Sequence, residues 1–180
     1  MNQVTKIKEW ESLLLEASIP RWDYLPDIEI YMDQLVKIVE KYTSPFQLNH
    51  SKAITPSMVN NYVKLKLVPK PHKKKYGKNH LARIIVITIL KQAFEIPDVK
   101  KGIEFQIDST SAKEAYNFFC DHLETTITCF INKDNESITI EQLKQDYAPI
   151  QMACTTFIAK LITERNLDDL LQQTKLLEEK

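Results

Sequence analysis

Apolar side chains recur at every third or fourth position over the first part of the chain. This spacing predicts an amphipathic helix over Val4–Ala17 and a second one over Asp27–Tyr42, which starts directly after Pro26. The stretch between the two helices also holds Pro20, so we expect it to be a connector. Both helices would turn one apolar face toward a common core.

A third helix is predicted from about Pro56 to Leu65. Thr55 is a suitable N-cap, Pro56 suits the first helical position, and Pro69 prevents continuation. One side of this helix is apolar, whereas the other side carries hydrogen-bonding groups and no carboxylate. The residues of this polar side are Ser57, Asn60, Asn61 and Lys64.

The segment Val68–Tyr76 combines prolines with a run of lysines, which favours a short extended hairpin over a helix. After it, the pattern predicts a long and largely buried helix over His80–Phe94, capped by Asn79. Most positions of that helix are apolar, so we expect it to be largely buried; the apolar residues include Leu81, Ile84, Ile85, Ile87 and Ile89.

The pattern over the rest of the chain is weaker. It predicts a short helix over Pro97–Lys101 that ends at Gly102, and then an extended stretch over Ile103–Ser109. A capping box opens a helix over Ser111–Thr126. The final part, Ile140–Glu179, is predicted to form two or three helices.

Glycine is scarce, because the 180 residues include only Gly77 and Gly102. A P-loop or a dinucleotide fingerprint needs several glycines within a few residues, since the backbone must approach the phosphate closely. Both types of site are therefore excluded. The three cysteines and four histidines show neither metal-ligand spacing nor a nucleophile–base pattern. We predict no catalytic residue, no metal and no cofactor, and hence no enzyme.

No apolar run approaches the roughly 20 residues that a helix needs to cross a bilayer. The N-terminal residues mix charged and aromatic side chains and lack the apolar core of a signal peptide. We expect a cytoplasmic protein without a membrane partner.

The charges are distributed unevenly along the chain. Between Lys41 and Phe94 there are 11 Lys and Arg residues and no Asp or Glu, whereas the other 126 residues carry 13 cations and all 24 acids. A formal net charge of zero therefore hides a segment at +11 beside a remainder at −11. Such a segment indicates binding to a polyanion. A solvated basic surface is the alternative explanation.

The order of helix, basic segment and long helix between Ile54 and Arg83 resembles the DNA-binding head of the MerR family of winged helix-turn-helix regulators. Val59–Pro69 matches the end of that family's recognition helix, Lys75 and Tyr76 match the end of its wing, and Asn79–Ile84 matches the start of its long helix. The glycine that ends the recognition helix in that family is replaced here by Lys66.

The wider chain, including Ile19–Trp22 and Leu25–Gln34, resembles an uncharacterised bacterial family, domain of unknown function 1836. That resemblance implies no activity. The MerR resemblance implies a mainly α fold: a winged helix-turn-helix domain with an N-terminal helical extension over residues 1–110, a small β-hairpin wing, and a helical C-terminal region over residues 111–180 for dimerisation or signal sensing.

These features together predict a sequence-specific DNA-binding transcriptional regulator, with a recognition helix at about 56–65 and a basic wing at about 69–78. Lysines would contact phosphates and release counterions, while asparagines can pair with adenine in the major groove. The expected partners are double-stranded DNA and a second copy of the chain in a homodimer. The predicted DNA-binding residues are Ser57, Asn60, Asn61, Lys64, Lys66, Lys70, His72, Lys73, Lys74, Lys75 and Lys78.

Two other functions fit the same charge pattern. A protein-interaction adaptor with a helix-turn-helix fold could dock its basic face on an acidic partner, which could be the acidic half of another copy. An RNA-binding protein would need stacking aromatic side chains on an exposed basic sheet, and the sequence predicts no such sheet. Asn60 and Asn61 also have the simpler interpretation of two ordinary surface amides.

Overall fold

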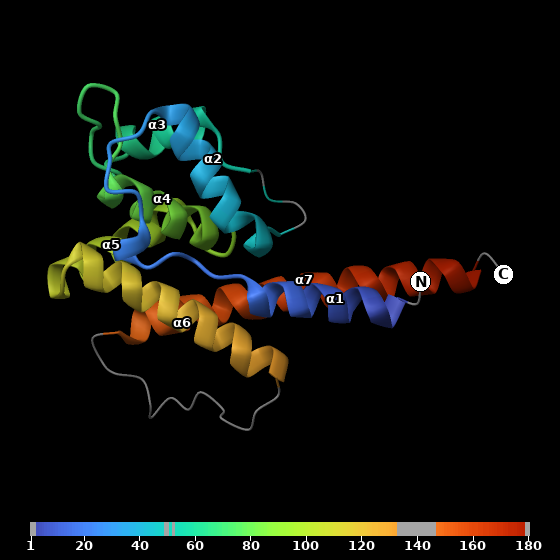
Figure 1. Cartoon of the computed structure of the whole chain (residues 1–180). Helices are drawn as coiled ribbons and strands as arrows, with labels where there is room; N and C mark the ends of the chain where they lie inside the picture. The colour runs from blue at the N-terminus through green and yellow to red at the C-terminus, as the bar shows by residue number, and fades with distance from the viewer. Residues whose placement is uncertain (1–2, 49–50, 52, 133–146, 179–180) are drawn as a thin grey trace.

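Helices make up most of the described chain (Figure 1). The structure is a computed structural model that describes residues 3–48, 51, 53–132 and 147–178. Two short 3₁₀ turns, Trp22–Tyr24 and Ser44–Phe46, lie between the α-helices. The α-helices are α1 (Gln3–Glu16), α2 (Met32–Thr43), α3 (Pro56–Lys64), α4 (Lys78–Leu90), α5 (Ile96–Ser109), α6 (Ala112–Asn132) and α7 (Ala148–Glu178).

Helix α4 is the central helix of the molecule. Its residues from Leu81 to Leu90 are buried except for Arg83, as expected of a helix that is apolar on all sides. Helices α2, α5, α6 and α7 all contact it. The prediction of a long buried helix here is confirmed, but the helix ends at Leu90 and not at Phe94. It begins at Lys78 with Gly77 as its N-cap, so the prediction of Asn79 as the cap was wrong.

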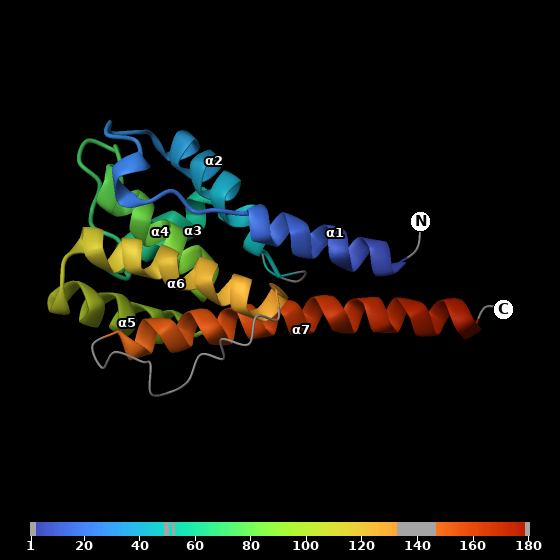
Figure 2. The ribbon, with the colours of Figure 1, turned by 60° about the horizontal axis from the view of Figure 1, so that its bottom comes forward.

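Helices α1 and α7 lie side by side and extend together away from the body of the molecule (Figures 1 and 2). The two ends of the chain therefore lie at the same end of the molecule. Residues 140–146 of the last predicted part lie outside the described residues, and the division of the rest into more than one helix was wrong, because Ala148–Glu178 is one continuous helix. Pro149 stands in the first turn of α7, where its missing N–H leaves no hydrogen bond unmade.

Helix α5 also corrects the sequence-based expectation. The prediction that a helix ends at Gly102 and that Ile103–Ser109 is extended was wrong, because α5 runs through Gly102 to Ser109. Val99 and Gln106 lie two turns apart on one face of α5 and are both buried. Packing of that face offsets the roughly 1 kcal/mol that an interior glycine costs a helix.

The connector between α1 and α2 is fixed to α6. Arg21 donates two hydrogen bonds to the Glu124 carboxylate at 2.9 and 2.6 Å and forms an ion pair with Asp121 at 2.7 Å. Trp22 N–H donates to the Asn117 side-chain oxygen at 2.8 Å. One half of the predicted capping box at the start of α6 is found: Glu114 N–H donates to the Ser111 hydroxyl at 3.2 Å, and that hydroxyl donates to the Glu114 carboxylate at 2.8 Å.

The predicted β-hairpin wing was wrong, because the described residues contain no β-strand. Only two isolated bridges occur near the basic segment, His72 with Lys75 and Ile30 with Tyr76. Pro69 lacks the N–H that the first arm of a hairpin would donate, as does Pro71. The second arm pairs instead with the residues before α2.

This pairing also explains a second error in the sequence-based assignment. Helix α2 begins at Met32, and not at Asp27, because Ile30 exchanges two backbone hydrogen bonds with Tyr76 at 2.9 and 2.8 Å. In addition, the connection from α2 to α3 spans residues 44–55, whereas a helix-turn-helix joins its helices by three or four residues. The fold is all-α but is not the predicted winged helix-turn-helix.

Candidate nucleic-acid interface

Helix α3 presents a polar face to solvent. Its start is fixed by Thr55, whose hydroxyl accepts the Met58 N–H at 3.2 Å, and its inner side is fixed by the buried Val59 and Tyr62. Positions three and four residues apart share one side of a helix. The four predicted residues of the polar face are all exposed on that side: Ser57, Asn60, Asn61 and Lys64.

The end of α3 is closed by a Schellman motif that contains a lysine where glycine is usual. Leu67 N–H donates to the Tyr62 carbonyl at 2.9 Å, and Lys66 N–H donates to the Val63 carbonyl at 3.1 Å. Lys66 has a φ of 60°, which is the left-handed conformation that favours glycine. Its side chain is exposed, so the motif directs one more cation outward beside α3.

The segment Pro69–Lys78, here named the basic turn, reverses direction at Lys73 and Lys74. These two residues have φ values of 47° and 64°, and Lys75 N–H closes the turn on the His72 carbonyl at 2.8 Å. Positive φ at both central residues is the pattern of a type I′ turn, in which Asn and Gly are the usual residues. Two exposed lysines therefore form the tip of the basic turn.

The base of the basic turn is buried and uncharged. The buried Tyr76 ring contacts the edge of the His80 ring at a centroid distance of 5.5 Å. The Nδ1 atom of His80 accepts the Gly77 N–H at 3.0 Å, which requires an unprotonated Nδ1. Burial lowers the pKa of His80, although the nearby Lys70 backbone opposes this shift. The neutral ring thus links the turn to the first turn of α4.

Two of the predicted DNA-binding cations have partners within the protein. Lys78 lies 3.3 Å from the Asp27 carboxylate, and the half-buried Lys75 lies over the Tyr31 ring at 5.5 Å from its centroid. Asp27 lies outside the acid-free sequence segment but next to the basic turn in space, through the pairing of Ile30 with Tyr76. Counting charges along the sequence could not reveal that Asp27 lies next to the basic turn.

The other predicted cations are exposed and have no ion pair within 4.0 Å among the residues that the structure describes. Helix α3 and the basic turn lie at the same end of the molecule in Figure 1, opposite the extended ends of α1 and α7. The two elements that carry most of the predicted site therefore lie at one end of the molecule. These exposed residues are the lysines Lys64, Lys66, Lys70, Lys73 and Lys74 and the histidine His72.

The aromatic side chains near this face have packing roles. Tyr62 and Tyr76 are buried, and burial raises the pKa of both hydroxyls. Trp10 packs with Arg165, whose guanidinium carbon lies 5.6 Å from the centroid of the Trp10 ring. Trp22 lines a cavity of about 270 Å³ next to α4.

Within the described ranges, no group of three or more His, Cys, Asp or Glu residues is placed to hold a metal ion. None of the described helices is both long enough and apolar enough to span a membrane. Cys120 and Cys154 are buried, and burial raises the pKa of the Cys120 thiol to about 12. A thiol with so high a pKa is almost fully protonated near neutral pH, so Cys120 is a poor nucleophile.

Residues 20–119 match the family described as Domain of unknown function (DUF1836), and the chain belongs to that family. The matched range contains α2, α3, the basic turn, α4 and α5. No curated protein and no solved structure matches the chain. The family assigns no activity, so the function has to be argued from the site itself.

Proposed function

We propose that this protein binds double-stranded DNA through the polar face of α3 and the basic turn, and that it regulates transcription by this binding. The observation that carries the proposal is the tip of the basic turn. There, Lys73 and Lys74 are held outward in left-handed conformations, and neither has an ion pair among the described residues.

The backbone of the tip supports a role in binding. A residue other than glycine in a left-handed conformation costs on the order of 1 kcal/mol or more, and such residues are often found at functional sites. The tight turn places two exposed cations next to each other in the chain. Phosphate contacts release counterions and supply affinity that does not depend on sequence.

Helix α3 supplies the groups that could distinguish bases. The nine residues of this helix present Asn60 and Asn61 to solvent next to the basic turn, and the major groove is wide enough for an α-helix. An asparagine can donate to N7 and accept from N6 of adenine in a bidentate pair, worth roughly 1–3 kcal/mol of discrimination. Lys64, at the end of the same face, would contact phosphate.

The first experiment measures the affinity for a random-sequence duplex by fluorescence anisotropy, using the variant Lys73→Glu/Lys74→Glu. The matched control is Lys8→Glu/Lys113→Glu, which changes the net charge equally but on α1 and α6. We expect the first variant to lose at least about tenfold in affinity, because two phosphate contacts become repulsive, and the control to lose little. Equal losses in the two variants, or no binding by the unmodified protein, would contradict the proposal.

Sequence specificity has its own test, a binding-site selection followed by Asn60→Ala/Asn61→Ala. This variant should keep its affinity for random DNA and lose preference for the selected site. If selection enriches no sequence, the protein binds DNA without specificity. If no DNA binds and an acidic protein co-purifies through the basic turn, the adaptor alternative replaces the DNA-binding proposal.

A homodimer is part of the proposal, since two copies would present two basic turns to one duplex. The extended part of α7 exposes three leucines at spacings of three and four residues, with exposed fractions of 53%, 59% and 53%. Such an apolar stripe is suited to helix pairing. The leucines are Leu167, Leu170 and Leu171. Sedimentation of the unmodified chain, and of a variant in which all three leucines are replaced by glutamine, tests the homodimer, since only the unmodified chain should dimerise.

A further inference from the structure

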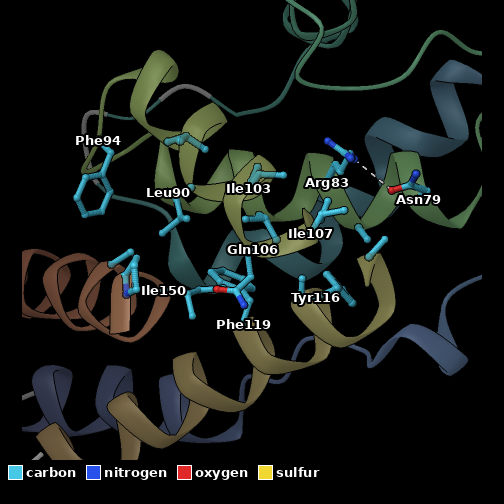
Figure 3. A pocket seen from close by; sticks show the side chains of 18 of the residues that line it. Asn79, Arg83, Leu90, Phe94, Ile103, Gln106, Ile107, Tyr116, Phe119 and Ile150 are labelled. Carbon is cyan, nitrogen blue, oxygen red and sulfur yellow. Dashed lines mark hydrogen bonds between the residues drawn. The ribbon is translucent and has the colours of Figure 1, made fainter. Parts of the chain in front are cut away.

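A cavity of about 270 Å³ lies between α4, α5, α6 and the start of α7 (Figure 3). Its walls are mostly apolar, with Leu90, Ile103, Phe119 and Ile150 among them. An apolar cavity of about 150 Å³ in another protein holds benzene, so this cavity has room for about ten non-hydrogen atoms. That is the size of a small molecule and not of a peptide.

Two side chains of the cavity wall have buried polar atoms without a hydrogen-bond partner among the described residues: Gln106 has two such atoms and Tyr116 has one. Gln106 is 3% exposed, and within the described part of the chain neither its amide oxygen nor its amide nitrogen has a hydrogen-bond partner. Figure 3 shows this side chain between Phe119 and Ile150 in the cavity. Buried amides are normally hydrogen-bonded, because an unpaired donor and acceptor have both lost their water. The occupant of the cavity is therefore the candidate partner of Gln106.

The surroundings of Gln106 select the chemistry of that occupant. A charged group would be poorly solvated among the apolar side chains, so the group that meets Gln106 is neutral. The cation of the cavity wall, Arg83, lies beside Asn79 in Figure 3 and donates to its side-chain oxygen at 3.2 Å and to the Leu67 carbonyl at 3.1 Å. Its hydrogen bonds thus fix the end of α3 to α4 and do not require an anionic ligand.

We propose that this cavity binds a neutral, mostly apolar small molecule of about ten non-hydrogen atoms. The molecule carries one amide-type group, whose donor and acceptor both pair with the amide of Gln106. The apolar part of the molecule packs against Leu90, Ile103 and Phe119. This proposal does not depend on whether the protein binds DNA.

Calorimetric titration with three probes of similar length tests the proposal. Octanamide offers a donor and an acceptor, methyl heptanoate offers acceptors alone, and octanoate is charged. We expect octanamide to bind at least tenfold more tightly than either of the other two. In Gln106→Leu this preference should disappear, because leucine keeps the packing volume but cannot form hydrogen bonds.

Two further variants distinguish a ligand site from a packing defect. Thr88→Val removes another buried polar group without a partner among the described residues, outside this cavity, and should leave binding of octanamide unchanged. Ile103→Trp fills the cavity and should abolish binding of all probes, which keeps the test usable if Gln106→Leu fails to fold.

Three outcomes would overturn the proposal. The first is no binding of octanamide up to its solubility limit, in which case Gln106 is paired by water alone. The second is octanoate binding as tightly as octanamide. The third is a folded Gln106→Leu variant that binds octanamide as the unmodified protein does.

Discussion

Arg21 and the lysines at the tip of the basic turn are all cations, but they differ in whether carboxylates of the protein pair with them. The guanidinium of Arg21 is fully engaged, by Glu124 at 2.6 Å and Asp121 at 2.7 Å, and these hydrogen bonds raise its pKa above the usual range. Lys73 and Lys74 are exposed and have no ion pair among the described residues. The contrast teaches that the position of the acids in space, and not their absence along the sequence, distinguishes a structural cation from one that can bind a partner.

The largest expected effect is on the structural cation. Arg21→Met keeps the apolar stem but leaves the half-buried Glu124 without its cation, and hydrogen bonds to charged groups contribute roughly 1.5–3 kcal/mol each. We expect the free energy of unfolding to fall by about 2 kcal/mol in urea denaturation, with DNA affinity unchanged.

A matched surface pair makes this comparison sharper. Lys113 lies 2.8 Å from Asp23, but both side chains are more exposed, at 49% and 67%. Lys113→Met should change stability by less than about 0.5 kcal/mol, since exposed ion pairs contribute little. If Arg21→Met and Lys113→Met lower the free energy of unfolding equally, burial does not distinguish the two ion pairs.

The local signals around α3 were strong enough for prediction. Thr55, Pro56 and Pro69 define its start and its limit through their own backbone preferences, and the helix is found at Pro56–Lys64. The start of α2 could not be predicted in the same way. Asp27–Tyr31 would suit a helix locally, but Ile30 pairs with Tyr76, 46 residues further along.

The two candidate sites also differ in how much of each could be predicted from local sequence. The basic turn was visible in the sequence because charge and proline are local signals, but the Lys78 pairing with Asp27 depends on the fold. Gln106 gave no signal at all. A glutamine in a segment expected to be extended has no reason to be singled out until α4, α6 and α7 surround it.

The next largest effect is expected at Lys66, which is both strained and exposed. Lys66→Gly should raise the free energy of unfolding by about 1 kcal/mol, since glycine adopts the left-handed conformation without steric cost. The same variant should also reduce the slope of log K for DNA against log salt concentration by the contribution of one phosphate contact. Lys64→Gly is the control, because α3 is right-handed there and stability should fall. A Lys66→Gly variant that is no more stable than the unmodified protein would show that the left-handed backbone conformation of Lys66 is not strained.

The smallest expected effect is the response of the basic turn to pH. The folded protein lowers the pKa of His80 below its ordinary value of 6.5, so the unfolded chain binds a proton more readily. The stability that neutral His80 contributes is complete above pH 6.5 and is lost as pH falls through the lowered pKa. Urea denaturation at several pH values should show this loss, and His80→Gln should reduce it. An unchanged pH profile in that variant would contradict the role given to His80.

The most direct test of the central claim is the salt dependence of DNA affinity for the unmodified protein and for Lys73→Gln/Lys74→Gln. Each lost phosphate contact should reduce the slope of log K against log salt concentration by about 0.9. We expect a slope that is shallower by about 1.8 in this double variant, with Lys8→Gln/Lys113→Gln unchanged. An identical slope for the unmodified protein and the Lys73→Gln/Lys74→Gln variant would show that the tip of the basic turn does not contact DNA.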